Sequence, residues 1–129
     1  MLNQDTPLNE AVDPVKQVIY LDSEIGLKYY DDCWDYYKEA VEIFEDRLHA
    51  LVNELYAVQM VNNLEQIRVL THSLSGIAGL VGAIPLQASA KKIELLIQHQ
   101  QIEGLDGLLE ELIRVIKHTQ LAAKNILQN

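Results

Sequence analysis

The chain of 129 residues is poor in cysteine, proline and basic side chains. The single cysteine, Cys33, excludes a disulfide within the chain and a zinc site built from cysteines. Lys and Arg number 10 against 19 Asp and Glu, so the net charge is −9. A protein that neutralises nucleic-acid phosphates needs a basic surface, and we therefore expect no nucleic-acid binding. For the same reason we expect no membrane contact through a polybasic anchor.

Long hydrophobic runs are also missing. The longest nearly apolar stretch, residues 76–86, is too short to span a bilayer and contains Pro85. The N-terminal residues lack the basic and then apolar run of a signal peptide. Together with the single cysteine, these absences predict a cytoplasmic protein. The acidic excess lies in residues 1–60, and the second half of the chain is balanced in charge.

The three prolines fall at the boundaries of the expected elements. Pro7 and Pro14 belong to a polar segment, residues 1–18, which we interpret as a leader or a linker from a longer chain. Residues 19–129 then form one domain, and the 49% hydrophobic content is enough for a packed core. Pro85 follows a turn and suits the first turn of a helix.

The spacing of apolar residues is helical over most of residues 19–129. It predicts a short helical segment over 22–30 and a long helix over 32–59, with Asp32 as the capping residue of the long helix. The apolar positions of the long helix recur at alternating steps of three and four: Trp34, Tyr37, Val41, Phe44, Leu48, Leu51, Leu55 and Val58.

Three further helices are predicted to begin after Asn63, near Pro85 and near Leu105. The last is expected to bury Leu108, Leu112, Val115, Thr119, Ala122 and Ile126. No segment alternates with a period of two, so no strand is expected. The fold class that follows is all-α, an antiparallel up-down four-helix bundle with a short N-terminal helix.

The third long helix carries one histidine on the side opposite its apolar stripe. With Leu74 at the centre of the buried face, His72 falls roughly 160° away on a helical wheel. Gly76 and Gly79 share this outer side with His72. A glycine inside a helix costs roughly 1 kcal/mol relative to alanine. Two readings account for the pair: open access of a partner to the imidazole, or a weakened or closely packed helix.

The segment around His72 resembles the histidine phosphotransfer (HPt) domain family, whose pattern is His-x-Leu-Lys-Gly, five residues, then Gly-Ala. The residues in register with this pattern are His72, Leu74, Gly76, Gly82 and Ala83. Further matches are Leu86 and Ile93-Glu94 in the next helix and Ile25-Gly26-Leu27 upstream. The resemblance covers about residues 20–127.

This resemblance implies that His72 accepts a phosphoryl group from a receiver-domain aspartate and passes it to another receiver. A neutral imidazole is a good nucleophile near pH 7, because its reference pKa is about 6.5. The partners implied are receiver domains of a response regulator or a hybrid histidine kinase. The chain itself is expected to need no cofactor, since Mg²⁺ would belong to the receiver.

Further residues around His72 are candidates for supporting roles, Glu94 by resemblance to the family and the others by their position on the helix. Glu94 is expected either to hydrogen-bond the other ring nitrogen of His72 or to be an exposed helix charge. Arg68 is expected to contact phosphate or to pair with Glu65. Val69 and Leu80 flank the outer face and are expected to form an apolar docking patch for the receiver.

One residue departs from the family pattern. Ser75 occupies the position three residues after the histidine where the family usually has lysine. By resemblance, that lysine places positive charge beside the phosphoryl group. We therefore expect either slower transfer than in a lysine-bearing relative, or a cation supplied by the docked partner or by Arg68.

Other chemistries lack their motifs. A di-iron bundle needs paired Glu-x-x-His motifs, and the sequence has no Walker loop and no kinase signature for ATP. We therefore expect no metal site and no autokinase activity, in a stand-alone carrier or in a domain of a hybrid kinase. The alternatives are an HPt-like module that docks receivers without phosphotransfer, and a generic helical adaptor.

Overall fold

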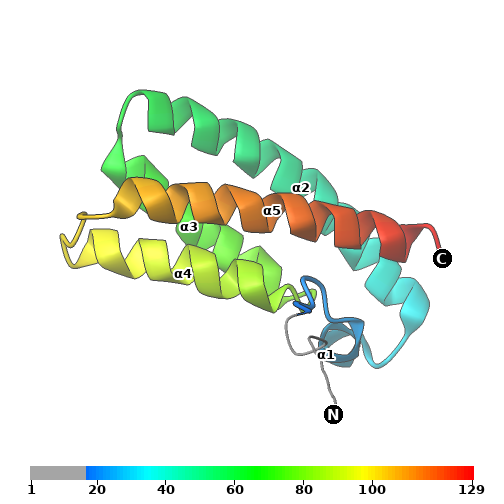
Figure 1. Ribbon diagram of the computed structural model, residues 1–129. Coiled ribbons are helices and arrows are strands. Elements are labelled where there is room, and N and C mark those ends of the chain that lie inside the picture. The colour runs from blue at the N-terminus through cyan, green and yellow to red at the C-terminus, as the bar shows by residue number, and fades with distance from the viewer. Residues whose placement is uncertain (1–16) are drawn as a thin grey trace, which may run out of the picture.

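The computed structural model describes residues 17–129, which are helical with no strand. Figure 1 shows a short N-terminal helix at one end of a bundle of long helices. The elements, in chain order, are α1 (Ser23–Leu27), η2 (Lys28–Tyr30), α2 (Trp34–Met60), α3 (Leu64–Gly79), α4 (Ile84–Gln98) and α5 (Leu105–Leu127). The segment interpreted as a leader or linker, residues 1–18, lies almost wholly outside the described residues.

The four long helices form a closed bundle around one hydrophobic core. Helices α2, α3 and α4 each pack against the next helix in the chain, and α5 packs against both α4 and α2. Successive helices run in alternating directions in Figure 1, which is compatible with the expected up-down arrangement. The all-α bundle predicted from the sequence is therefore confirmed. The largest fully buried side chains of the hydrophobic core include Leu48, Leu74, Leu86 and Leu112.

The start of α2 differs from the prediction that Asp32 caps it. Asp31 and Asp32 both have positive φ angles, 54° and 56°, and belong to the turn that ends η2. The backbone N–H of Asp32 donates to Leu27 and that of Cys33 donates to Tyr30, so the chain is still turning at these residues. The helix begins at Trp34, and its capping position is Cys33, which makes no side-chain cap hydrogen bond.

Helix α3 begins where expected, because Asn63 caps it. The Asn63 side chain accepts a hydrogen bond of 3.1 Å from the backbone N–H of Gln66. This bond satisfies one of the free N–H groups of the first turn. The cap sets the start of the helix and hence the direction in which each later side chain points.

The buried face of α5 lies partly one residue further along than predicted. Leu112, Val115 and Thr119 are buried as expected. The positions expected to be buried but only partly so are Leu108, Ala122 and Ile126. Leu109 and Ala123 are buried in place of Leu108 and Ala122, and Ile116 is buried in addition to Val115. Helix α5 contacts both α2 and α4, and a helix between two neighbours buries a wider stripe than a single seam.

A tight junction joins α1 to the turn between α3 and α4. The backbone N–H of Asp22 donates to the carbonyl of Gly82 at 2.9 Å, and the Tyr37 hydroxyl donates to the Val81 carbonyl at 2.8 Å. Gly82 has a φ of +85°, and Gly26 lies against the Val81 backbone. Burial, with nearby Asp22, raises the pKa of Tyr37 to about 12. The junction anchors the C-terminal end of α3, the helix that carries His72.

Candidate functional site

His72 lies at the middle of α3 and faces solvent. Its side chain is 69% exposed, whereas Ile67, Leu74 and Ala78 on the opposite face are almost fully buried. The rigid packing of that face holds the helix, and the polar face is left open. The outward position of His72 on the helical wheel is therefore observed in the structure.

The two glycines that share the outer side of α3 have different surroundings. A methyl group added at Gly76 would meet nothing within 4 Å, so the surface one turn after His72 is open. A methyl group at Gly79 would lie 2.5 Å from the side-chain nitrogen of Gln87 on α4. Gly76 thus fits the access reading of the glycine pair, and Gly79 fits the close-packing reading.

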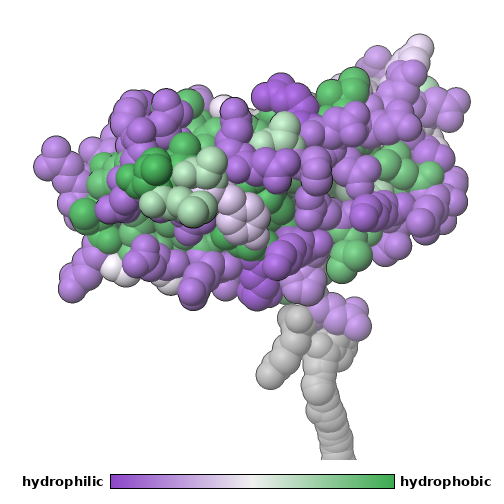
Figure 2. Space-filling model, turned by 90° about the horizontal axis from the view of Figure 1, so that it is seen from above, coloured by the Kyte–Doolittle hydropathy of each residue, from purple (hydrophilic) through white to green (hydrophobic). Residues whose placement is uncertain are grey.

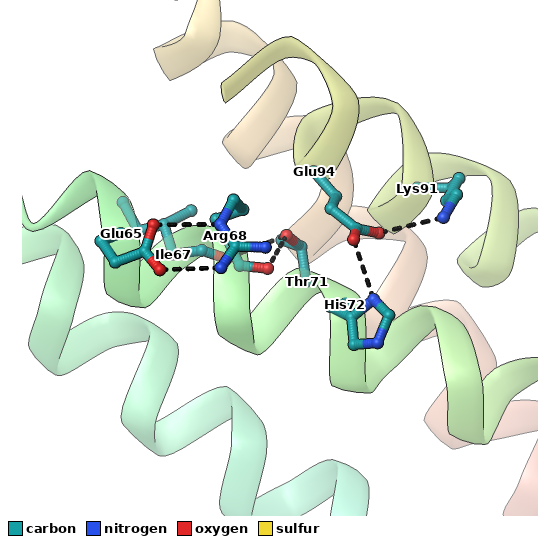
Figure 3. Close-up of polar contacts among 7 residues, drawn as sticks. All are labelled: Glu65, Ile67, Arg68, Thr71, His72, Lys91 and Glu94. Carbon is teal, nitrogen blue, oxygen red and sulfur yellow. Dashed lines mark hydrogen bonds and ion pairs between the residues drawn. The ribbon is translucent and has the colours of Figure 1, made fainter. Parts of the chain in front are cut away.

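A buried carboxylate from α4 binds the imidazole (Figure 3). His72 Nδ1 lies 2.8 Å from Glu94 Oε2, and the Glu94 side chain is only 7% exposed. Burial alone would raise the pKa of Glu94, but hydrogen bonds from His72 and Lys91 outweigh burial and lower this pKa. Glu94 is therefore ionised at neutral pH and can only accept, so Nδ1 carries the proton and donates it. The lone pair of the neutral ring is then on Nε2.

Lys91 is the second partner of this carboxylate, and the sequence did not lead us to assign it to the site. Its Nζ lies 3.3 Å from Glu94 Oε1, and Figure 3 shows Lys91 and His72 on the two oxygens of one carboxylate. Lys91 precedes Glu94 by three residues, so both project from the same face of α4. That spacing is the signal by which Lys91 could have been found once Glu94 was placed beside His72.

Arg68 lies one turn before His72 on α3 and is bound to Glu65. The guanidinium donates to both carboxylate oxygens of Glu65, at 3.0 and 2.7 Å. This pairing raises the pKa of Arg68 and lowers that of Glu65. Of the expected arrangements, the structure shows the ion pair with Glu65.

Two apolar side chains stand on the other flank of His72. Val69 and Leu80 are exposed, at 42% and 52%. Leu80 lines a groove of about 440 Å³ between α2 and α3, together with Ile43, Ile77 and Tyr36. Val69 lies outside this groove. Ser75, the departure from the HPt pattern, is half-buried.

The chemistry available at this site is that of a single nucleophilic nitrogen. Within residues 17–129 no three His, Cys, Asp or Glu side chains are grouped so as to hold a metal ion. The same part of the chain has no helix that is both long and apolar enough to cross a membrane. What remains is an imidazole with one nitrogen held by a carboxylate and the other exposed. Fold and site together define a helical bundle with an exposed histidine at the middle of one helix.

Comparisons with known proteins agree with this class. The profile of the Hpt domain family matches residues 39–124. A crystal structure of histidine-containing phosphotransfer protein B (HptB) from Pseudomonas aeruginosa PAO1 aligns with a TM-score of 0.75 at 19% identity. The alignment covers 87% of this chain and 97% of that chain. The comparison with curated proteins gives no match. The chain belongs to the Hpt domain family, and membership supports a role in a histidine phosphotransfer relay.

Proposed function

We propose that His72 is the phosphoacceptor of this domain and that Nε2 is the atom that takes the phosphoryl group. The observation that carries the proposal is the bond between His72 Nδ1 and the ionised Glu94. With Nδ1 protonated and engaged, the free electron pair is on Nε2. Most of the His72 side chain is exposed, and Gly76 leaves the adjacent surface open.

The donor in this proposal is an aspartyl phosphate on a receiver domain. The Nε2 lone pair forms a bond to phosphorus while the bond from phosphorus to the aspartyl oxygen breaks, and the leaving carboxylate keeps that electron pair. The Nδ1 proton stays in place, so the phosphorylated ring carries a positive charge. Glu94 accepts from that charged ring through Nδ1, which stabilises the product. The reverse reaction passes the group to a second receiver.

The chain acts as a carrier in this scheme rather than as a kinase. Its own contribution is a positioned nucleophile, and Mg²⁺ is expected on the receiver, where it would stabilise the charge of the phosphoryl group in flight. The sequence contains no ATP-binding signature, which favours a receiver over ATP as the donor. We also propose that the domain acts in the cytoplasm, as the single cysteine of the sequence predicts.

A receiver would dock on the side of α3 that faces α2. The exposed side chains of Tyr36, Ile43 and Leu80 line the groove between α2 and α3, and Val69 is a further exposed hydrophobic residue of α3. Figure 2, which views the molecule from the side of α2, shows hydrophobic patches among polar side chains. An exposed apolar surface next to a nucleophile gives a partner a place to bind before transfer.

The experiment is incubation of the purified chain with a panel of phosphorylated receivers, followed by tracking of the label. We expect at least one receiver to label the wild type with acid-labile, base-stable phosphate, and no receiver to label His72→Gln. The matched control is His99→Gln, an exposed histidine at the end of α4, which should label normally.

Three results would overturn the proposal. Labelling of a folded His72→Gln variant would show that another residue is the acceptor. Receivers that bind the wild type without transferring phosphate would favour a docking module, and a chain that binds no receiver would favour a generic helical adaptor.

A further inference from the structure

We propose that Lys91 on α4 supplies the positive charge that stabilises the phosphoryl group on His72, in place of a lysine at position 75 of α3. The inference rests on the proposed function of His72. It is carried by the position of Lys91 relative to Ser75, by its present partner and by its exposure.

The register between α3 and α4 places Lys91 at the level of Ser75. His72 contacts Glu94, and seven residues further along α3 Gly79 lies against Gln87, which is seven residues earlier on α4. The two helices are therefore antiparallel and keep a constant register between these contacts. Three residues after His72 is Ser75, and three residues before Glu94 is Lys91. The cation thus stands across the helix interface from the serine.

Lys91 is also free to move towards a phosphoryl group. It holds Glu94 through a single contact of 3.3 Å, and its side chain is 51% exposed. The flexible four-carbon stem of a lysine lets the ammonium turn from one anion to another nearby. A phosphoryl group with two negative charges on Nε2 competes with Glu94 Oε1 for this ammonium.

Arg68, the other cation near His72, is less available. Its guanidinium makes two bonds to Glu65 and is only 31% exposed. Releasing it requires both bonds to break, whereas Lys91 gives up one longer contact. Glu94 keeps its hydrogen bond to the charged ring of phosphorylated His72 when Lys91 leaves. The carboxylate therefore remains paired in both states.

The chain offers a matched control in Lys92. The substitution Lys92→Gln removes one positive charge from α4, as Lys91→Gln does. Lys92 lines a groove between α4 and α5 with Tyr20 and Leu108, on a different face from His72. A general effect of net charge on receiver binding would appear equally in Lys91→Gln and Lys92→Gln.

The test compares wild type, Lys91→Gln, Lys92→Gln and the double variant Ser75→Lys/Lys91→Gln, using one phosphorylated receiver that transfers to the wild type. We expect Lys91→Gln to lower the transfer rate or the phosphohistidine lifetime about threefold to fivefold, the effect of one partly exposed charge pair. Lys92→Gln should match the wild type. The double variant should recover most of the loss, since it returns the charge from α3. The deficit of Lys91→Gln should shrink at high salt, because salt screens the missing charge.

Equal rates for Lys91→Gln and Lys92→Gln would overturn the inference while leaving His72 as acceptor. A deficit that the double variant does not recover, and that salt does not reduce, would also overturn it, because Lys91 would then act only by holding Glu94. A wild type that takes no label from any receiver would instead overturn the proposed function, and this inference with it.

Discussion

The carboxylate of Glu94 is almost fully buried. Burying a charge is costly unless the charge is paired, and here each oxygen has its own partner, His72 Nδ1 and Lys91 Nζ. Removing either partner leaves the charge less compensated. The stability of the bundle and the chemistry of His72 are therefore linked, because both depend on the Glu94 side chain.

Glu94 should make the stability of the fold depend on pH. Burial of Glu94 opposes its charge, but the bonds from His72 and Lys91 lower its pKa below the ordinary 4.5. A lowered pKa in the folded state stabilises the fold above the unfolded-state pKa, and this contribution disappears as the pH falls through the folded-state pKa. The free-energy difference between wild type and Glu94→Gln should be about 1 kcal/mol at pH 7, and it should disappear as the pH falls below 4.5 and through the lowered pKa of Glu94.

Urea unfolding of both proteins at several pH values between 7 and 3 measures this difference. The other carboxylates are common to the two proteins and cancel in the comparison. A difference that stays constant over the whole range would show that the charge of Glu94 does not contribute to stability.

At Gly76, the effect of a side chain on access to His72 can be separated from its effect on folding. Nothing stands within 4 Å of a methyl group there, and glutamine is a better helix former than glycine. Gly76→Gln should keep or raise the free energy of unfolding, by up to about 1 kcal/mol. It should still slow transfer to His72 more than about tenfold, because its side chain would cover the approach to the imidazole.

Gly107 in α5 is the matched control for Gly76. It is also a helical glycine with open space around it, on a helix that does not carry the site. Gly107→Gln should fold at least as well as the wild type and transfer at the wild-type rate. Transfer by Gly76→Gln at the wild-type rate would contradict the access interpretation.

At the scale of the elements, α1 and the α3–α4 turn form a junction that depends on two glycines. A methyl group at Gly82 would lie 2.2 Å from the Asp22 carbonyl oxygen, and one at Gly26 would lie 2.5 Å from the Val81 carbonyl oxygen. Both obstacles are backbone atoms, which cannot turn aside as a side-chain tip can. The short helix α1 therefore stays close to the end of α3 only while both positions lack a side chain.

Gly82 and Gly104 both have a positive φ angle, and only Gly82 lies against α1. Gly82→Ala should lose at least about 2 kcal/mol of unfolding free energy, from left-handed backbone strain and from the clash with Asp22. Gly104→Ala carries a similar strain, with φ of +79° but open space, and should lose only about 1 kcal/mol. Equal losses in the two variants, measured by urea unfolding, would mean that the contact with α1 contributes nothing.

At the scale of the whole molecule, periodicity predicted the helices and the bundle, because each helix buries one face and shows it in the spacing of its apolar residues. The same wheel placed His72 outward. The wheel could not predict that Lys91 contacts Glu94, that Gln87 lies over Gly79, or that Leu109 rather than Leu108 is buried. Those features depend on which neighbour a helix packs against, and a single-helix pattern does not contain that information.

The measurement that tests the central claim most directly is NMR of the phosphorylated chain with ¹⁵N-labelled histidines. The sequence has four histidines, so each ring can be followed. After transfer from a phosphorylated receiver, we predict that only the ring of His72 changes, that its Nε2 shows coupling to ³¹P, and that Nδ1 keeps its proton. Phosphorus on Nδ1 of His72, or on another histidine, would contradict it.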